Sequence, residues 1–432
     1  MPISDILGRA YSAWNACAGL RSRRARCKRF TYGDQWSDPV ADGRNGTLTE
    51  AELIERSGKH AYTNNLIRQL VKTVVGRYRT NAADAAVYAG DIAAVARANS
   101  LAELDARLLE EFLISGCAIQ RIVDERRWNG SGVWIDNVDP RRFFVNAFCD
   151  PRGWDIDLCG MLHDMSLPEI INRFAGSSAA RAAELRKLFG TADATADSGL
   201  TGMESTTGSF FCSGAAGKYR VVEVWSFDSR PGSDSSPDAD FCWHCRFFAP
   251  DGTLLTDYDS PYGHGSHPFA VKFYPLTDGE VHSFVEDVLD QQKFINRLVV
   301  TLDHIMACSA KGVLLFPTDQ LPKNVSWDHV ADAWARADGV IPVTGRGTAM
   351  PQQVVTTAAG NNAFELLGLQ MKLFEQVSGV GSALMGRASG ARGADMLDNE
   401  VRNATIALAD LFDSFTAFTD QRNAKALAVA RV

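Results

Sequence analysis

"AGNNAFELLGLQMKLFEQVSGVGSALMGRASG" (residues 359–390) joins an amphipathic helix to a glycine-rich loop. Apolar side chains in its first half recur at helical spacing, at Phe364, Leu367, Met371 and Phe374. Five glycines then fall within 377–395, after which helical periodicity resumes. Glycine at this density predicts a loop between two helices. It is either a phosphate-binding loop of an enzyme or a flexible loop held in an open space.

A further long helix is predicted on each side of this helix and loop. Residues 280–310 repeat apolar side chains every seven positions from Val288 to Leu302, and a helix of that length would span about 45 Å. Residues 395–420 carry an apolar seam that can face the core of its own subunit or a neighbouring subunit. Between the first two helices, residues 311–358 predict short strands and proline turns around a short helix.

Residues 60–280 predict a mixed α+β unit. Helices are expected, from the spacing of apolar residues, at 4–29, 64–79 and 100–116. Strands are expected, from short β-branched and aromatic runs, at 132–146 with a break at a turn at Asp139–Pro140, and at 219–227, 241–248 and 269–274. Ser100 and Glu103 have the spacing of an N-terminal capping box, as do Asn362 and Glu365 near the start of the helix at 361–377.

The 432-residue chain has the composition of a soluble globular protein, with 46% hydrophobic and 22% charged residues. It has no run of about 18 uncharged apolar residues and no basic start followed by an apolar stretch, so neither a membrane span nor a secretory signal is expected. Its nine scattered cysteines favour reduced thiols inside a cell. The net charge of −8 argues against a surface that grips nucleic acid tightly.

One segment departs from this acidic balance. The run "RSRRARCKRF" (21–30) contains six cations and no acid. Such a run is either a solvated helix face or a contact for an anionic partner. The candidate contact residues are Arg21, Arg23, Arg24, Arg26, Lys28 and Arg29.

The glycine-rich loop departs from the motif of nucleotide-binding enzymes. "GSALMGRA" (381–388) has the glycine spacing of GxxxxGK[ST]. Arg387 and Ala388 replace the lysine and the hydroxyl that contact phosphates and magnesium, and the segment follows a helix instead of a strand. No GxSxG nucleophile elbow is present. We therefore expect no enzyme activity and no cofactor.

A zinc motif is suggested by "CWHC" (242–245). On a strand, Cys242 and His244 point to one face and Cys245 points to the other, so the three side chains cannot converge on one ion. We expect half-buried strand residues here and no metal.

The order of these segments resembles the portal proteins of tailed bacteriophages. The resemblance rests on "VEDVLDQQKFINRLVVTL" (285–302), on residues 359–390 and on the start of the helix that follows. "YTNNLIRQLVKTVVGRYR" (62–79) and the pair "DPRRFFVN" and "DPRGWDIDLCG" (within 139–160) look like the wing of a portal subunit. The resemblance covers most of residues 30–420.

The resemblance to portal proteins implies an α+β, ring-forming subunit of portal type. The implied parts are an N-terminal helix and loop (1–59), a mixed α/β wing (60–280), a stem helix (281–310), a small β-rich clip (311–358), a second stem helix (359–378), a glycine-rich tunnel loop (379–395) and a long C-terminal wing helix (396–432) with the crown short or absent.

The implied function is to form a dodecameric ring at one capsid vertex, a channel for double-stranded DNA during packaging and ejection. The implied partners are other copies of the chain, double-stranded DNA without sequence preference, the terminase large subunit, the major capsid or scaffolding protein, and a head-completion or adaptor protein. The protein would reside in the virion, and in the host cytoplasm during assembly. The residues expected to face DNA in the tunnel loop are Gly379, Gly381, Gly386, Arg387, Gly390 and Arg392.

Two alternatives stay open. One is a nucleotide-binding enzyme that uses the loop at 381–388, and the other is a different structural adaptor of the virion.

Overall fold

The computed structural model describes residues 3–42, 46–84, 88–127, 130–190, 210–213, 217–229, 241–309, 313–335, 341–344, 351–354, 358–380 and 406–430. The chain divides into two compact units. The first contains Met1–Thr31, Arg68–Asp287 and Ser382–Val432, and the second contains Tyr32–Ile67 and Val288–Gly381. Helices and strands are mixed within the described residues, so the fold belongs to the α+β class that the sequence predicts.

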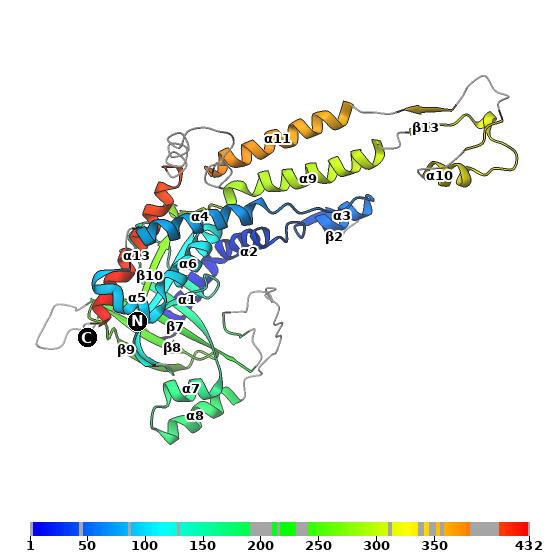
Figure 1. Ribbon diagram of the computed structural model, residues 1–432. Helices are drawn as coiled ribbons and strands as arrows, with labels where there is room; N and C mark the ends of the chain where they lie inside the picture. Colours follow the sequence, from blue (N-terminus) through cyan, green and yellow to red (C-terminus); the bar gives the residue numbers. More distant parts are fainter. Residues whose placement is uncertain are drawn as a thin grey trace, which may run out of the picture. The chain divides into compact units, whose positions relative to one another are not determined.

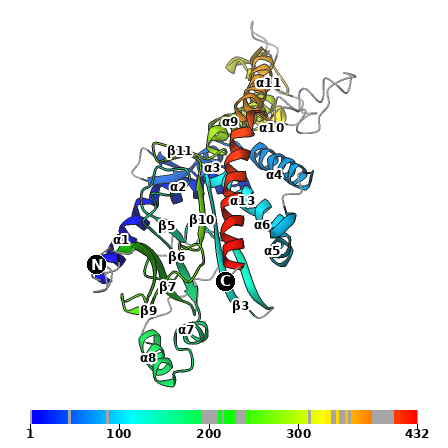
Figure 2. The ribbon, with the colours of Figure 1, turned by 90° about the vertical axis from the view of Figure 1, so that its left-hand side faces the viewer.

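A five-stranded antiparallel sheet forms the centre of the first unit, with strands in chain order (Figures 1 and 2). Its strands are β5 (Phe143–Val145), β6 (Leu158–Met165), β7 (Tyr219–Ser229), β8 (Phe241–Phe248) and β9 (Leu254–Asp259). A second sheet has the order β10-β3-β4. Its strands are β3 (Cys117–Arg127), β4 (Gly130–Asn137) and β10 (Phe269–Phe273). The strands expected from β-branched and aromatic runs are therefore confirmed.

Each face of the five-stranded sheet is covered by a separate apolar core, because side chains alternate along a strand. Trp225 of β7 and Phe247 of β8 lie in a core that also contains Phe269 and Val271 of β10. On the opposite face, Val224 lies in a core closed by the helix α1 (Ile3–Ala16). On its two faces the five-stranded sheet is thus covered by α1 and by the sheet of β3, β4 and β10.

The C-terminal helix α13 (Ala409–Ala430) packs against β3 and β10, and Figures 1 and 2 both show it running alongside β10. Leu411, Phe415 and Phe418 of the predicted apolar seam are buried. Over the described part of this seam, the side chains therefore face the core of their own subunit. The helix also continues to Ala430, beyond the predicted end at 420.

Most of the other helices of the first unit precede β6 in the sequence. They are α2 (Ala18–Tyr32), α4 (Leu66–Asp84), η1 (Gly90–Ile92), α5 (Ala93–Asn99), α6 (Leu101–Ser115), α7 (Leu167–Phe174) and α8 (Ala179–Gly190), of which α2 and α4 extend into the second unit. A short antiparallel pair, β11 (Pro275–Thr277) and β12 (Glu280–Val281), precedes the long helix α9 (Glu286–Ser309).

The second unit is built on α9, most of which belongs to it, and on α11 (Ala358–Ser378). Between these helices lie η2 (Thr318–Gln320), α10 (Trp327–Ala335) and the antiparallel pair of β13 (Val313–Leu315) with β14 (Gln352–Val354). The N-terminal part of the unit adds a hairpin of β1 (Pro39–Asp42) and β2 (Gly46–Thr49), followed by α3 (Glu50–Arg56).

Several predicted helix ends were wrong. The helix expected at 280–310 begins at Glu286, where the Ser283 hydroxyl accepts from the Glu286 amide at 3.2 Å and the Glu286 carboxylate accepts from the Ser283 amide at 2.7 Å. This reciprocal pair stops the helix from extending back through residues 280–281, which form β12. The helix expected at 4–29 breaks between α1 and α2, at Cys17.

Both predicted capping boxes were also wrong. Ser100 lies in the left-handed region with a φ of 52° and makes no side-chain cap hydrogen bond, because it ends α5 and starts α6 at the same time. The helix α11 starts at Ala358, so Asn362 and Glu365 lie inside it. Over the residues that the structure describes, no helix combines the length and hydropathy that crossing a lipid bilayer requires.

Candidate functional site

The glycine-rich loop begins where α11 ends, at Ser378. Gly379 follows with a φ of 65°, in the left-handed region that glycine adopts without steric cost after a helix. The Ser378 hydroxyl donates to the carbonyl of Glu375 at 3.1 Å and accepts from the amide of Val380 at 3.3 Å. The turn that leads into the loop is thus fixed by local hydrogen bonds. Gly381, Gly386, Arg387, Gly390 and Arg392 lie outside the described residues.

The helix α11 exposes large apolar side chains. Phe364 is 51% exposed, Leu369 is 52% exposed and Met371 is 40% exposed, whereas Phe374 is buried. The apolar stripe that the sequence predicts is therefore covered at Phe374 and open at Phe364 and Met371. Phe364 and Met371 are seven residues apart and lie on one side of α11, whereas Leu369 lies on another side. Exposed apolar surface of this kind marks interaction faces in soluble proteins.

The second unit holds its N-terminal segment against α9 through two cations. Lys293 forms ion pairs with Asp38 at 2.8 Å and with Glu50 at 3.2 Å, and Arg297 contacts Glu50 at 2.6 Å. The Asp38 and Glu50 side chains are largely buried. Part of the polar face of α9 is thereby neutralised by contacts within the unit.

The basic run at 21–30 falls on α2, and two of its cations are buried. The Arg21 guanidinium lies 3.8 Å from the centre of the Trp14 ring and donates to the Trp14 carbonyl at 2.6 Å. Arg24 donates twice to the Glu111 carboxylate, at 2.7 and 2.8 Å. Arg21 and Arg24 therefore act inside the fold, which corrects their selection as candidate contacts for an external anion.

The other four cations of this run are more accessible. Arg23 is exposed, and it donates to the Val281 carbonyl at 3.1 Å and pairs with Glu286 at 3.5 Å. Arg26, Lys28 and Arg29 are half-buried. Of the six candidates on α2, these four remain accessible to an external anion.

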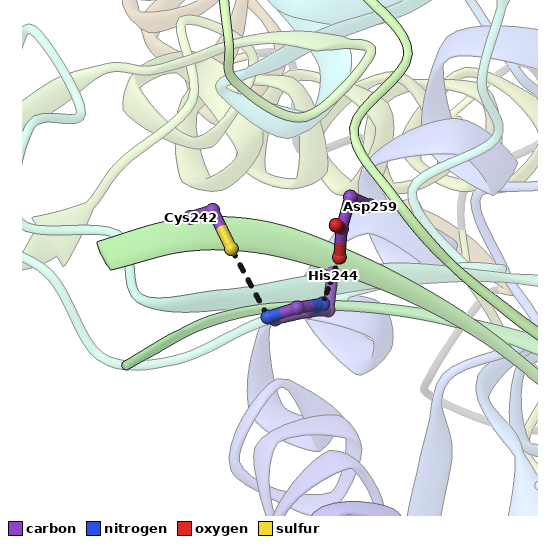
Figure 3. Close-up of side chains that lie close together, drawn as sticks. All are labelled: Cys242, His244 and Asp259. Carbon is purple, nitrogen blue, oxygen red and sulfur yellow. Dashed lines mark hydrogen bonds and ion pairs between the residues drawn. The ribbon is translucent and has the colours of Figure 1, made fainter. Parts of the chain in front are cut away.

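The "CWHC" segment lies on β8, as expected, and Cys245 points into the apolar core away from Cys242 and His244. Figure 3 shows that Asp259 of β9 joins Cys242 and His244 on their face of the sheet. Asp259 could not be identified from the sequence, because the pairing of β9 with β8 cannot be read from the spacing within either strand. These three side chains are the group of potential metal ligands that the described residues bring together.

The buried carboxylate of Glu223 is the centre of a second polar cluster in the first unit. It accepts from the Trp225 indole at 2.7 Å, contacts the His163 ring at 2.6 Å and pairs with Arg121 at 3.3 Å. Burial raises the pKa of Glu223, but the Arg121 charge and the His163 hydrogen bond outweigh burial and lower it. This cluster is closed off inside the fold and has a structural role.

Comparison with protein families gave one match that spans most of the chain. The model of the family described as "Phage P22-like portal protein" matches residues 7–111 and 214–430. Comparison with curated proteins gave no match.

Proposed function

The chain belongs to the phage P22-like portal protein family, and we propose that copies of it form a dodecameric ring at one vertex of the capsid. Membership makes the chain a structural component of a phage virion. In the proposal, double-stranded DNA passes through the centre of the ring during packaging and again during ejection.

The observation that carries the ring is exposed apolar surface on two sides of α11, with Phe364 and Met371 on one side and Leu369 on another. Phe364, Leu369 and Met371 are at least 40% exposed in a single chain. Burying a side chain of this size contributes about 1.5–3 kcal/mol, and in a ring each subunit contacts its two neighbours through two different surfaces. Packing of a neighbouring copy against each side of α11 therefore supplies the stabilisation that these side chains lack in one chain.

We assign the other parts of a portal subunit to this chain from the order of its helices and strands. We assign residues 60–280 to the wing, 281–310 and 359–378 to the stem, 311–358 to the clip and 396–432 to the C-terminal wing helix. The clip assignment is supported by the β13–β14 pair and the short α10, which together form a small β-containing tip between α9 and α11. In this proposal the clip binds first the terminase large subunit and later a head-completion or adaptor protein.

The tunnel loop at 379–395 would project into the channel. Arg387 and Arg392 would contact passing phosphates, which carry no base information and so impose no sequence preference. The net charge of −8 suits a channel that must release DNA, because many lysine and arginine contacts would make binding tight. The proposed function includes no enzyme activity.

Electron microscopy of the purified full chain tests the proposal. We expect rings of twelve subunits with an axial hole wide enough for duplex DNA, about 20 Å, a scale that the groove dimensions of DNA set. A monomer that hydrolyses ATP and loses this activity on Arg387→Ala would instead support the nucleotide-binding enzyme. Rings that do not stimulate or bind the terminase large subunit would support the adaptor.

A further inference from the structure

The face of the five-stranded sheet that carries Val224 changes from apolar to polar along its strands. At one end, Val222 and Val224 of β7 pack under α1. At the other end, the pairing of β7, β8 and β9 places polar residues side by side on this face, at Ser226, Asp228, Cys242, His244, Arg246, Asp257 and Asp259. The proposed portal function assigns no role to this polar end.

Three of these residues form a chain of contacts through the His244 ring. The Cys242 sulfur lies 3.1 Å from His244 Nε2, and Asp259 Oδ1 lies 2.7 Å from His244 Nδ1 (Figure 3). One donor atom from each residue can be chosen so that all three atoms lie within 4.8 Å of one another. Cys242 and His244 share a face because they are two positions apart on β8, and the register brings Asp259 directly opposite His244.

We propose that Cys242 and His244 bind a divalent cation of the zinc type, through Sγ and Nε2, and that Asp259 orients the ring from its other side. Thiolate and imidazole are ligands that Zn²⁺ prefers. The two nitrogens of an imidazole point away from each other, so only one of them can reach a given ion. A histidine that binds zinc commonly donates its other N–H to a carboxylate, and Asp259 already occupies that position.

The ion replaces the contact between Cys242 and His244. Zinc bonds of about 2.3 Å to sulfur and 2.0 Å to nitrogen at a tetrahedral angle place those two atoms about 3.5 Å apart. The pair must therefore open by only a few tenths of an ångström from 3.1 Å. The Cys242 thiol loses its proton to solvent as the Sγ–metal bond forms.

The surroundings permit entry of a cation. The Asp259 side chain is 41% exposed and that of His244 is 13% exposed, so the cluster opens to solvent on the β9 side. The nearest cation along the strand, Arg246, donates to the Ser226 hydroxyl at 2.9 Å and pairs with Asp228 at 3.1 Å. Its charge is thus balanced within the sheet, and water would complete the coordination of the ion.

Titration of the reduced full chain with Co²⁺ tests this site, because a thiolate bound to Co²⁺ gives a charge-transfer band that other ligands do not give. We expect one Co²⁺ per chain with this band, and displacement of Co²⁺ by Zn²⁺. Cys242→Ser should abolish the band and His244→Gln should abolish tight binding. Asp259→Asn should keep the band but weaken binding about 10–100-fold, since it removes only the partner of a ligand.

The exposed thiols Cys149 and Cys212 provide matched controls. Cys149→Ser and Cys212→Ser should each retain the band and the affinity of the unmodified protein. Circular dichroism spectra that match between all variants confirm that each one is folded. The site is ruled out if the unmodified protein gives no thiolate band, or if the band survives Cys242→Ser. Unchanged affinity in His244→Gln or Asp259→Asn would overturn the role assigned to that residue.

Discussion

Arg422 of the C-terminal helix and Asp105 of α6 form a buried ion pair between residues that are 317 positions apart in the chain. Two nitrogens of the Arg422 guanidinium donate to the two Asp105 oxygens, at 2.8 and 3.0 Å, and neither side chain has exposed surface. Gln120 accepts a further bond from Arg422 at 3.1 Å, and the Tyr88 hydroxyl donates to Asp105 at 3.1 Å. This network fixes the C-terminal helix to α6 by charge and to β3 by the Gln120 hydrogen bond.

Replacing Arg422 by methionine should therefore destabilise the protein by about 3–5 kcal/mol, because the Asp105 charge is left buried without its partner. The free energy of unfolding in urea, measured by circular dichroism, gives this difference. Arg107→Ala is the matched control, since Arg107 pairs with Glu103 on the surface, and it should cost less than about 1 kcal/mol. Equal losses in the two variants would contradict the assigned role of the buried pair.

The buried ion pair shows why part of this fold could not be predicted from the sequence. Heptad spacing identified the apolar seam of the C-terminal helix, and Leu411, Phe415 and Phe418 are indeed buried. Nothing in local spacing indicates that Arg422, on the same helix, meets Asp105. A pairing across 317 positions is decided by the whole topology, whereas helix and strand periodicity are local properties.

The candidate sites also show that local spacing predicts neighbours within a strand or helix but not contacts between distant residues. The spacing in "CWHC" correctly separated Cys245 from Cys242 and His244, because side-chain alternation on a strand is local. Asp259 was missed because its position depends on the register between β8 and β9. In the basic run, the charges alone could not reveal that Arg21 packs on the Trp14 ring or that Arg24 pairs with Glu111.

Gly160→Ala should be severely destabilising. A Cβ atom on Gly160 of β6 would collide with the backbone oxygen of Glu223 on β7 and with the ring of Phe144. A paired strand cannot withdraw its backbone, so we expect a loss of about 3 kcal/mol or more in the free energy of unfolding. Gly76→Ala is the control, because Gly76 lies within α4 with no atom near its Cβ position, and it should stabilise by about 0.5–1 kcal/mol. A soluble Gly160→Ala protein with an unchanged urea midpoint would refute this assignment.

Asp139 should make the protein lose stability in acid. Burial raises the pKa of Asp139, but hydrogen bonds from Arg141 and the charge of Arg24 outweigh burial and lower it to about 2 from the ordinary value of 3.8. Because the folded pKa is depressed, the contribution is complete above the unfolded pKa and disappears as pH falls from about 4 through 2. The shift corresponds to about 2 kcal/mol at pH 7.

The Asp139→Asn variant isolates this contribution. The difference in unfolding free energy between it and the unmodified protein should be about 2 kcal/mol at neutral pH. Urea titrations at a series of pH values should show that the difference shrinks as the pH falls through 4 toward 2. A difference that is constant across this range would show that the Asp139 charge is not responsible.

Asn296→Ala should loosen the N-terminal segment of the second unit. Asn296 of α9 donates to the Gln35 side chain at 2.5 Å and accepts from the Asn64 amide at 3.1 Å. Truncation leaves both partners unsatisfied, at a cost of about 1–3 kcal/mol. Hydrogen exchange of peptides that contain Asn64 should accelerate accordingly. The control is Asp303→Asn, which alters an exposed position on the same helix and should leave this exchange unchanged. Exchange in Asn296→Ala that is as slow as in the unmodified protein would contradict the prediction.

Leu369→Glu should prevent ring assembly. Leu369 lies with Leu366 on the second exposed apolar side of α11 and is 52% exposed in a single chain, so a glutamate there costs the free chain little. In the proposed ring this position is buried against a neighbouring copy, where a carboxylate without a partner costs several kcal/mol, and the penalty recurs at each contact around the ring. Sedimentation velocity should therefore show rings for the unmodified protein and monomers or small oligomers for Leu369→Glu. Asn172→Glu adds the same charge at an exposed polar position of α7, away from α11, and should leave assembly intact. If Leu369→Glu still sediments as the same ring, the side of α11 that carries Leu369 is not a contact between subunits.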